Sequence, residues 1–375
     1  MAVNKYGDHL PLERQARVMA REGLIVESQT LWDQIEALAT ALQPTYGALR
    51  HYVLTAPVIG ADETWWRLFG GPQRTRWWAW SLTREDAVTY TILDSRSQEA
   101  AREVLNGYRG IVVADGYGAY DALARAGPSF LLAHCWAHVR RKFVEAESHY
   151  PEPCAEVLEL IGQLDAVERT CPGIAAGVND ACRTERLALR ATARREQSAP
   201  IVAAIRAWAH RQRALPESSL GKAIAYMLGL WRGLTCFLDD PRIALDNNAT
   251  ERALRGMVIG RKNHYGSRSK RGTEVAALFY SLRDARRPRE SRNRHPAARA
   301  ADRVASAQTP DRSPSNPLWG IPRSYATTPG RIAGPDRWPG GRRSSPGERS
   351  GHSPGRRCGC SGRETGPPPG RRGGW

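Results

Sequence analysis

The sequence lacks three features that would assign it to familiar classes of protein. Its seven cysteines include no CxxC pair, which argues against a zinc finger or ribbon, and their odd number and irregular spacing favour reduced thiols in a cytoplasm. No run of about 18 apolar residues occurs, so no membrane span is expected. The polar stretch NKYGDHLPLERQ lies close behind Met1, so no secretory signal peptide is expected either.

Lysine is absent from Arg283 to Trp375, although this stretch holds 20 arginines against 7 acidic residues. It carries most of the net charge of +17, so the rest of the chain is only mildly basic. It also holds 14 prolines and 14 glycines but only four Leu, Ile, Val or Phe residues, too few to offset the entropy of ordering. We therefore expect residues 283–375 to form a disordered tail.

The change of composition falls inside an apolar, helical pattern, where a natural domain boundary is unusual. Arginine without lysine, beside proline, glycine, serine and alanine, is also what a GC-rich gene yields in a wrong reading frame. We therefore favour a frameshift near Leu282 as its origin. A genuine basic tail that binds nucleic acid is the alternative, and resequencing the gene would separate the two.

The N-terminal stretch, residues 1–50, predicts a pair of helices. PLERQARVMAREG is amphipathic and stops at Gly23, and Ser28 can cap a second helix, SQTLWDQIEALATAL. Such a pair can be a DNA-binding helix-turn-helix or a hairpin that serves packing alone. The packing hairpin is the favoured interpretation.

Residues 51–150 alternate between strand and helix patterns. A short apolar run ends at Asp62, RWWAWSLT and AVTYTILD have the alternation of antiparallel strands, and GIVVAD is a buried strand that ends at Asp115. The order of three strands, helix, strand, helix, strand and helix predicts an α/β fold with a mixed sheet. Residues 151–240 are helical in pattern, and residues 241–282 return to a loop and two helices.

Three acidic residues occupy positions where they could bind metal ions. Asp62 and Asp115 are predicted at strand ends, and Glu251 lies in the first turn of a late helix. Two carboxylates on neighbouring strands would repel each other unless a cation lay between them, and carboxylates suit Mg²⁺ or Mn²⁺. Each residue also has a structural explanation. Aspartate is common in turns, and Asn248 to Glu251 matches a capping box apart from Asn in place of Ser or Thr.

Six motifs follow one another along the chain: ADET, GIVVADGYGAYDAL, CWAHVRRKF, GKAIAYML, LDNNATERALRGMVIGRKN and GTEVAALFYSL. Together they resemble the catalytic domain of the bacterial insertion-sequence transposases of the family numbered sixty-six. The resemblance covers about residues 4–282 and implies an RNase H-like core with an all-helical insertion. It also implies an acidic triad, matched here by Asp62 in ADET, Asp115 in ADGYGAY and Glu251 in NNATERALR.

The resemblance implies a DDE-type DNA transposase. The triad would hold two Mg²⁺ or Mn²⁺ ions, so that a water cuts a phosphodiester at the transposon end and the freed 3′-hydroxyl attacks target DNA. The implied partners are double-stranded DNA, further copies of the chain in a homo-oligomer and other proteins encoded by the element. The implied location is the bacterial cytoplasm, at the nucleoid and away from membranes.

Two parts typical of longer family members are not evident in this sequence. These are the N-terminal DNA-binding region with its cysteine cluster and the usual continuation after FYSL. We therefore expect a truncated, defective copy of a transposase. A nuclease that cuts without strand transfer and a non-catalytic DNA-binding remnant that regulates full-length copies are the alternatives.

Basic residues near the motifs are candidate DNA contacts, because lysine and arginine supply affinity for phosphates. They are Arg140, Arg141, Lys142, Arg252, Arg255, Arg261 and Lys262. A solvated helix face is an equally good explanation for each.

His134 and His138 have a spacing that suits zinc, but no third ligand is evident. Tryptophans could stack on bases, although core packing is expected for most of them: Trp65, Trp66, Trp77, Trp78 and Trp80.

Overall fold

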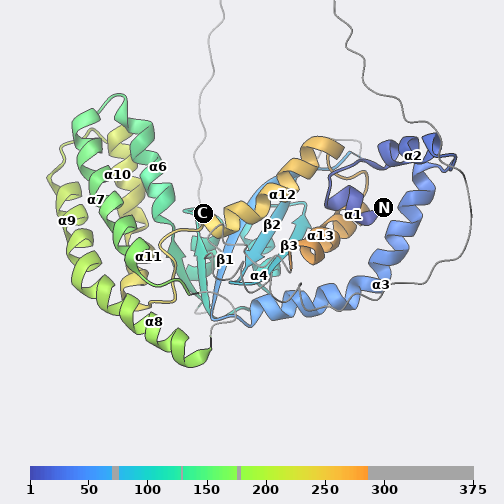
Figure 1. The fold of residues 1–375 in the computed structure, drawn as a ribbon. Helices are drawn as coiled ribbons and strands as arrows, with labels where there is room; N and C mark the ends of the chain where they lie inside the picture. The colour runs from blue at the N-terminus through green and yellow to red at the C-terminus, as the bar shows by residue number, and fades with distance from the viewer. Residues whose placement is uncertain (70–75, 128–129, 175–178, 286–375) are drawn as a thin grey trace, which may run out of the picture. The chain divides into compact units, whose positions relative to one another are not determined.

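Five strands form one mixed sheet at the centre of the fold. The computed structural model describes residues 1–69, 76–127, 130–174 and 179–285. Within these residues the strand order is β3-β2-β1-β4-β5 (Figure 1). The strands are β1 (Val58–Arg67), β2 (Arg76–Thr83), β3 (Val88–Leu93), β4 (Ile111–Ala114) and β5 (Leu131–His134).

Strand β1 occupies the middle of the sheet and pairs in two ways. It runs antiparallel to β2, which runs antiparallel to β3. On its other side β1 runs parallel to β4, which runs parallel to β5. The aromatic and β-branched segments RWWAWSLT and VTYTIL form β2 and β3, because such side chains pack well on a pleated surface. The predicted α/β fold with an RNase H-like mixed sheet is confirmed.

Helices cover both faces of the sheet. One face carries α4 (Gln98–Leu105) and α5 (Gly118–Arg125), which share an apolar core with β1, β2 and β4. The opposite face carries α12 (Asn248–His264) over β1 and β2, and α13 (Lys270–Asp284) over β3 (Figure 1). Residues 241–282 were predicted to form a loop and two helices. These helices, α12 and α13, cover the face of the sheet on which the side chain of Asp62 lies.

The N-terminal helices form a packing hairpin that continues further than predicted. They are α1 (Ala2–Tyr6), α2 (Leu12–Arg21) and α3 (Ser28–Leu54). Ser28 is the first residue of α3 and not its cap, because Glu27 occupies the cap position without a side-chain bond. α3 also continues through Pro44, since the helix packs against α13 and β3, and Tyr46 donates to the carbonyl of Tyr90. The boundary predicted at residue 50 thus falls inside a helix.

Helices α6–α11 gather beside the β5 edge of the sheet (Figure 1). They are α6 (Trp136–Glu147), α7 (Pro151–Thr170), α8 (Asp180–Ala193), a π-helical segment (Arg194–Ser198), α9 (Ala199–Arg211), α10 (Ser219–Gly229) and α11 (Trp231–Asp239). The predicted helical stretch is therefore helical. Its side chains share one apolar core with β4, β5 and α6, so these helices are built onto the sheet. Arg194 is fully buried there and is compensated by Glu168, whose Oε1 accepts its Nε at 2.6 Å.

The last described helix extends beyond the predicted start of the tail. α13 continues through Arg283 and Asp284, where the sequence predicted disorder. Arg283 donates to the backbone carbonyl of Tyr6, and Tyr90 Oη lies 3.0 Å from Oδ2 of Asp284. Arg283 and Asp284 therefore belong to the fold. Residues 286–375 of the predicted tail lie outside the described residues.

Two expectations about the class of protein can be compared with the described part of the chain. No helix there is long and apolar enough to cross a membrane. The five cysteines within it carry free thiols, and they are Cys135, Cys154, Cys171, Cys182 and Cys236.

Candidate active site

Asp62 lies in the middle of β1 and not at the end of a strand, as the sequence predicted. β1 continues to Arg67 because its second half pairs with β2. Its parallel pairing with β4 runs only as far as Gly60, which lies opposite Val113. Continued in the same register, Asp62 is level with Asp115, the residue after β4. The two aspartates therefore lie side by side where the parallel pairing ends.

Asp115 occupies a tight turn that its own side chain stabilises. Its Oδ1 accepts the backbone N–H of Tyr117 at 3.0 Å, and Nδ1 of His134 lies 3.2 Å from its carbonyl oxygen. A Cβ atom on Gly116 would lie 2.6 Å from Oη of Tyr226, a residue of α10. The turn-forming role considered for Asp115 is thus present. It also holds the carboxylate at one place beside Asp62.

Helix α12 begins directly on β1, and this close approach requires Gly60. A Cβ atom there would lie 2.1 Å from Oγ1 of Thr250, well inside van der Waals contact. The hydroxyls of Thr83 and Thr250 are 2.6 Å apart. The side-chain amide of Asn247 donates to the carbonyl of Ala61 over 2.8 Å. These contacts fix the first turn of α12, and so Glu251, on the strand that carries Asp62.

The predicted capping box is not formed at the start of α12. Asn247, not Asn248, occupies the cap position, and its side chain makes no capping bond. The side chain of Asn248 donates to Asp246 over 2.7 Å, and the backbone N–H of Asn247 donates to Sγ of Cys135 over 3.1 Å. Glu251 therefore lies in the first turn as predicted, but a capping box does not account for it.

The carboxylate of Glu251 points towards helix α6. Its Oε1 lies 3.4 Å from Nε2 of His138, and its Oε2 lies 3.9 Å from a guanidinium nitrogen of Arg141. Oε1 of Glu251 and Nδ1 of His138 are both buried and have no hydrogen-bond partner. A buried carboxylate oxygen without a partner loses hydration without compensation, so it fits the approach of a cation or a donor.

Asp62 is the acidic side chain most perturbed by this arrangement. Burial, and then repulsion by Glu63, Asp115 and Glu251, raise its pKa to about 7. The backbone N–H of Glu63 donates to its Oδ1 at 2.8 Å and opposes this rise only in part. The negative charges of the three predicted residues thus act on one another.

Glu63 is a fourth carboxylate at this level of the sheet, and the sequence analysis did not single it out. Its side chain accepts hydrogen bonds from Arg96 Nε at 2.7 Å and from Tyr120 Oη at 2.9 Å. Side chains alternate across a strand, so Glu63 faces α5 while Asp62 faces α12. That alternation in ADET was the available signal, and it assigns Glu63 to a structural network.

The donor set fits a hard divalent cation. Positive charge would stabilise the ionised form of Asp62, whose pKa burial and acidic neighbours raise, and would compensate Oε1 of Glu251, which lacks a hydrogen bond; carboxylate oxygens suit Mg²⁺ or Mn²⁺. In the described ranges, no group of three His, Cys, Asp or Glu side chains is close enough together to hold a metal ion. Binding would therefore have to draw Asp62, Asp115 and Glu251 closer.

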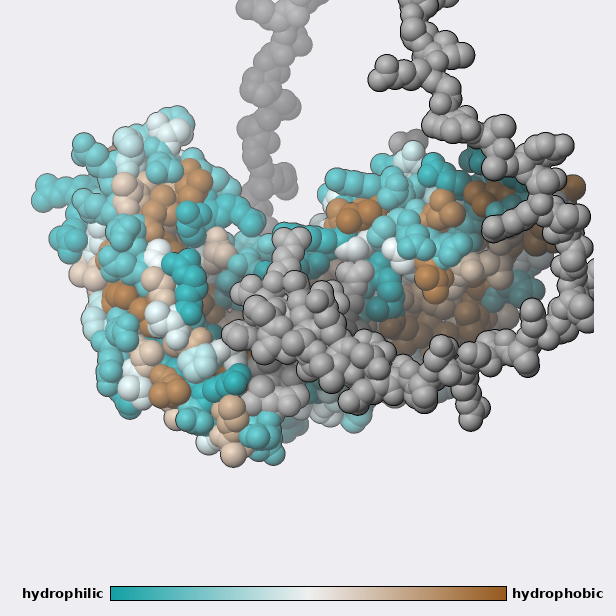
Figure 2. Space-filling view, in the orientation of Figure 1, coloured by the Kyte–Doolittle hydropathy of each residue, from teal (hydrophilic) through white to brown (hydrophobic). Residues whose placement is uncertain are grey.

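Six of the seven predicted DNA contacts are exposed at the surface, on α6 and α12: Arg140, Arg141, Lys142, Arg252, Arg255 and Lys262. On the face shown in Figure 2, the surface over α12 is mostly hydrophilic with small apolar patches. Arg261 differs because it is buried, packs 3.7 Å from the centroid of a Trp65 ring and donates to the carbonyl of Trp65. Burial lowers its pKa, and its guanidinium serves the protein interior.

The histidine pair and the tryptophans divide between separate environments. His134 contacts the backbone carbonyl of Asp115 and the carboxylate of Asp121, whereas His138 faces the carboxylate of Glu251. Trp66 and Trp80 are fully buried, as expected for core residues. Trp65 is 39% exposed.

Comparison with known proteins covers the whole of this site. A family model described as "Transposase IS66 family" matches residues 1–275. The uncharacterized protein y4jD of Sinorhizobium fredii (strain NBRC 101917 / NGR234) is 34% identical over 301 residues, which cover 75% of this chain and 57% of y4jD. The uncharacterized protein y4hP of the same organism is 30% identical over 306 residues, 74% of this chain and 53% of y4hP. The chain spans a little over half the length of these curated relatives.

Proposed function

We propose, since the chain belongs to the IS66 transposase family, that it cuts and joins insertion-sequence DNA through Asp62, Asp115 and Glu251. The observation that best supports this assignment is the position of Asp62, whose burial and acidic neighbours Glu63, Asp115 and Glu251 raise its pKa to about 7. A structural carboxylate is ordinarily neutralised by a nearby cation, as Glu63 is by Arg96. Within the described residues, Asp62 and Asp115 form no such ion pair, which favours a site for metal ions.

Asp62, Asp115 and Glu251 would hold the divalent ions, Mg²⁺ or Mn²⁺. Two such ions activate the attacking oxygen of a water or 3′-hydroxyl and stabilise the leaving oxygen of the phosphodiester. The protein itself supplies a rigid frame for the carboxylates. Gly60 admits the start of α12 to the strand, and the hydrogen bonds of Asp115 within its turn fix the second carboxylate.

The side chains around the triad position its members and bind the substrate. His138 and Arg141 keep the Glu251 carboxylate near α6. Exposed arginines and lysines on α6 and α12 would contact DNA phosphates on both sides of the carboxylates. These contacts carry no sequence information, so they position the duplex and do not select a transposon end.

The chain spans about half the length of its curated relatives. We therefore propose three further activities only for the complete transposition system: recognition of transposon ends, assembly of a homo-oligomer and contact with other element-encoded proteins. Cleavage requires only DNA, metal and the described site. It is therefore the step to test first.

The test is Mg²⁺-dependent nicking of a DNA duplex by the full chain, compared with Glu251→Gln and Asp115→Asn. Each variant keeps the size of the side chain but weakens metal ligation, so nicking should fall roughly 100-fold or more. Glu217→Gln is the matched control, because Glu217 is highly exposed and lies in the loop before α10. If the wild-type chain and Asp115→Asn bind DNA equally tightly and the wild type never cuts it, the result would favour the non-catalytic regulator.

A strand-transfer assay with pre-cut ends extends this test to the joining step. Transposition requires the 3′-hydroxyl of the pre-cut strand to appear joined to target DNA. Nicking without any joined product would instead assign the chain to the nucleases that cut without strand transfer.

A further inference from the structure

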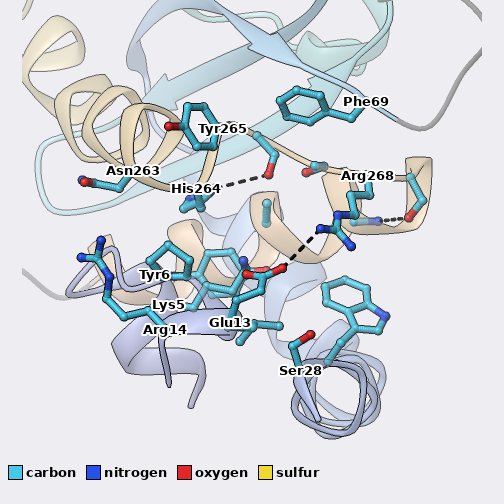
Figure 3. Close-up of a pocket in the computed structure, with 18 of the residues that line it drawn as sticks. Lys5, Tyr6, Glu13, Arg14, Ser28, Phe69, Asn263, His264, Tyr265 and Arg268 are labelled. Carbon is cyan, nitrogen blue, oxygen red and sulfur yellow. Dashed lines mark hydrogen bonds and ion pairs between the residues drawn. The ribbon is translucent and has the colours of Figure 1, made fainter. Parts of the chain in front are cut away.

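A large cavity lies away from the carboxylates, between the N-terminal helices and the connection from α12 to α13. Its volume is about 840 Å³ (Figure 3). Its described lining contains four cationic side chains, Lys5, Arg14, Arg17 and Arg268, against a single carboxylate, Glu13. The excess of positive charge suits an anionic ligand.

The single carboxylate of this lining forms an ion pair that a ligand can replace. Glu13 and Arg268 lie 3.3 Å apart, and their side chains are 54% and 87% exposed. Pairs this exposed contribute little to stability, on the order of 0–1 kcal/mol. Arg268 can therefore exchange Glu13 for a phosphate group at small cost.

Two aromatic side chains line the same cavity and are left open to solvent. Phe69 is 42% exposed and Tyr265 is 63% exposed. Figure 3 shows both on the side of the cavity that faces Tyr6, Glu13 and Ser28. Tyr265 has a left-handed φ of 64° at the position where α12 ends. Exposed rings beside arginines are the usual means of binding unstacked bases.

The two elements that carry Asp62 and Glu251 both lead to this cavity. β1 passes from Asp62 towards Phe69, and α12 passes from Glu251 to Tyr265, each over about 20 Å at the usual rise per residue. Their far ends are joined, because the backbone N–H of Phe69 donates to the carbonyl of Ser267 over 2.9 Å. A DNA strand that follows these two elements would therefore reach both the carboxylates and the cavity.

We infer that this cavity binds an unpaired nucleotide of a DNA strand, with its base against Phe69 and Tyr265 and its phosphate beside Arg268. An unpaired base is required because the faces of paired bases are covered by their neighbours in the duplex. The inference rests on the proposed function and deepens it, since the same strand would reach the carboxylates. The cavity thus assigns a second contact to the strand, apart from the chemistry.

The test is photo-crosslinking of the full chain to a single-stranded oligonucleotide that contains 5-iodouracil, followed by mass spectrometry of the crosslinked peptides. Crosslinks are expected at the peptides that contain Phe69 and Tyr265, and a duplex of the same sequence should compete poorly. Crosslinks confined to residues 286–375, or to α6 and the first half of α12, would overturn the inference.

Binding of the same oligonucleotide by variants gives a second, independent readout. Phe69→Ala and Tyr265→Ala should each weaken single-strand binding about tenfold and leave duplex binding within about twofold. Tyr52→Ala is the matched control, because Tyr52 is a 43% exposed aromatic on α3 and does not line the cavity. Equal losses in all three variants would also overturn the inference.

Asp115→Asn separates this inference from the proposed function. The variant should lose nicking but keep its crosslinks in the cavity. Crosslinks in the cavity without nicking by the wild-type chain would refute the catalytic proposal alone. Nicking without crosslinks in the cavity would refute the present inference alone.

Discussion

Nε2 of His138 lies 3.4 Å from Oε1 of Glu251, and neither this oxygen nor the far nitrogen of the imidazole has a hydrogen-bond partner. The histidine comes from α6 and the glutamate from α12, two helices separated by the whole helical stretch α7–α11. A second contact also holds the two helices together. The backbone N–H of Asn247, at the start of α12, donates to Sγ of Cys135 at the start of α6. The two helix starts are thus joined on either side of the candidate metal site.

His138→Ala should therefore reduce Mg²⁺-dependent nicking about 10- to 100-fold, the usual effect of removing a residue that orients a metal ligand. The loss should be recovered in part at higher Mg²⁺ concentration, because the imidazole positions Glu251 and does not itself bind the metal. A titration of nicking against Mg²⁺ measures this. His149→Ala, at an exposed position just beyond the end of α6, is the control, and equal behaviour of the two variants would refute the role of His138.

The raised pKa of Asp62 predicts how the stability of the metal-free protein depends on pH. The carboxyl binds a proton more tightly in the folded state, with a pKa of about 7, than in the unfolded chain, with a pKa near 3.8. Stability should therefore fall as pH rises from about 4 to about 7 and level off above that. Thermal unfolding of the wild type and of Asp62→Asn in a chelator would show this, because only the wild type should lose stability across that range through this group.

Added Mg²⁺ should reverse the loss. At pH 8 Asp62 is charged, because its pKa is about 7, so a cation should raise the midpoint of thermal unfolding of the wild type but not that of Asp62→Asn. At pH 5 the effect should be smaller, since protons already occupy Asp62. An equal shift in both proteins at pH 8 would show that Mg²⁺ binds elsewhere.

Much of the fold could be predicted from sequence, because its strands and helices have clear periodicity. The segments of β2, β3 and β4 and the order of strands and helices were evident from alternation and apolar runs. The position of Asp62 was not, since the end of an apolar run did not reveal that β1 continues in a second pairing with β2. Nor could a local pattern show that Asn247 donates hydrogen bonds to Ala61 and Cys135, because both partners are distant in sequence. For the same reason NxxE was misinterpreted as a capping box.

Gly60→Ala should damage the site more than the fold. The new methyl group would lie 2.1 Å from Oγ1 of Thr250 and would push the first turn of α12 away from β1. Overpacking of this kind typically costs about 1–3 kcal/mol of unfolding free energy. Nicking should fall far more than this loss implies, because Glu251 moves with the turn. A Cβ atom on Gly162, in α7, would meet open space, so Gly162→Ala should lower neither nicking nor stability. A Gly60→Ala protein with normal nicking would show that the close approach is unnecessary.

Arg255 and Arg261 lie on the same helix but are predicted to act differently. Arg255 is exposed, so Arg255→Ala should weaken duplex binding and reduce the slope of log affinity against log salt by about 1. Arg261 is buried against Trp65, so Arg261→Ala should lower thermal stability through lost packing and hydrogen bonds. Salt titrations of DNA binding and thermal unfolding distinguish the two. The assignment fails if Arg261→Ala unfolds normally and changes only the salt slope.

The contacts of Arg283 and Asp284 predict where the fold ends. A chain shortened after Ala285 keeps the bond from Arg283 to the carbonyl of Tyr6 and the bond between Tyr90 and Asp284, so it should unfold like the full chain. A chain shortened after Leu282 loses both and leaves the hydroxyl of the buried Tyr90 with one partner fewer. It should be less stable by about 1–3 kcal/mol, the usual cost of removing buried hydrogen bonds. Chemical unfolding of the two shortened chains measures the difference. Equal midpoints and slopes would restore the boundary at Leu282 that composition alone had indicated.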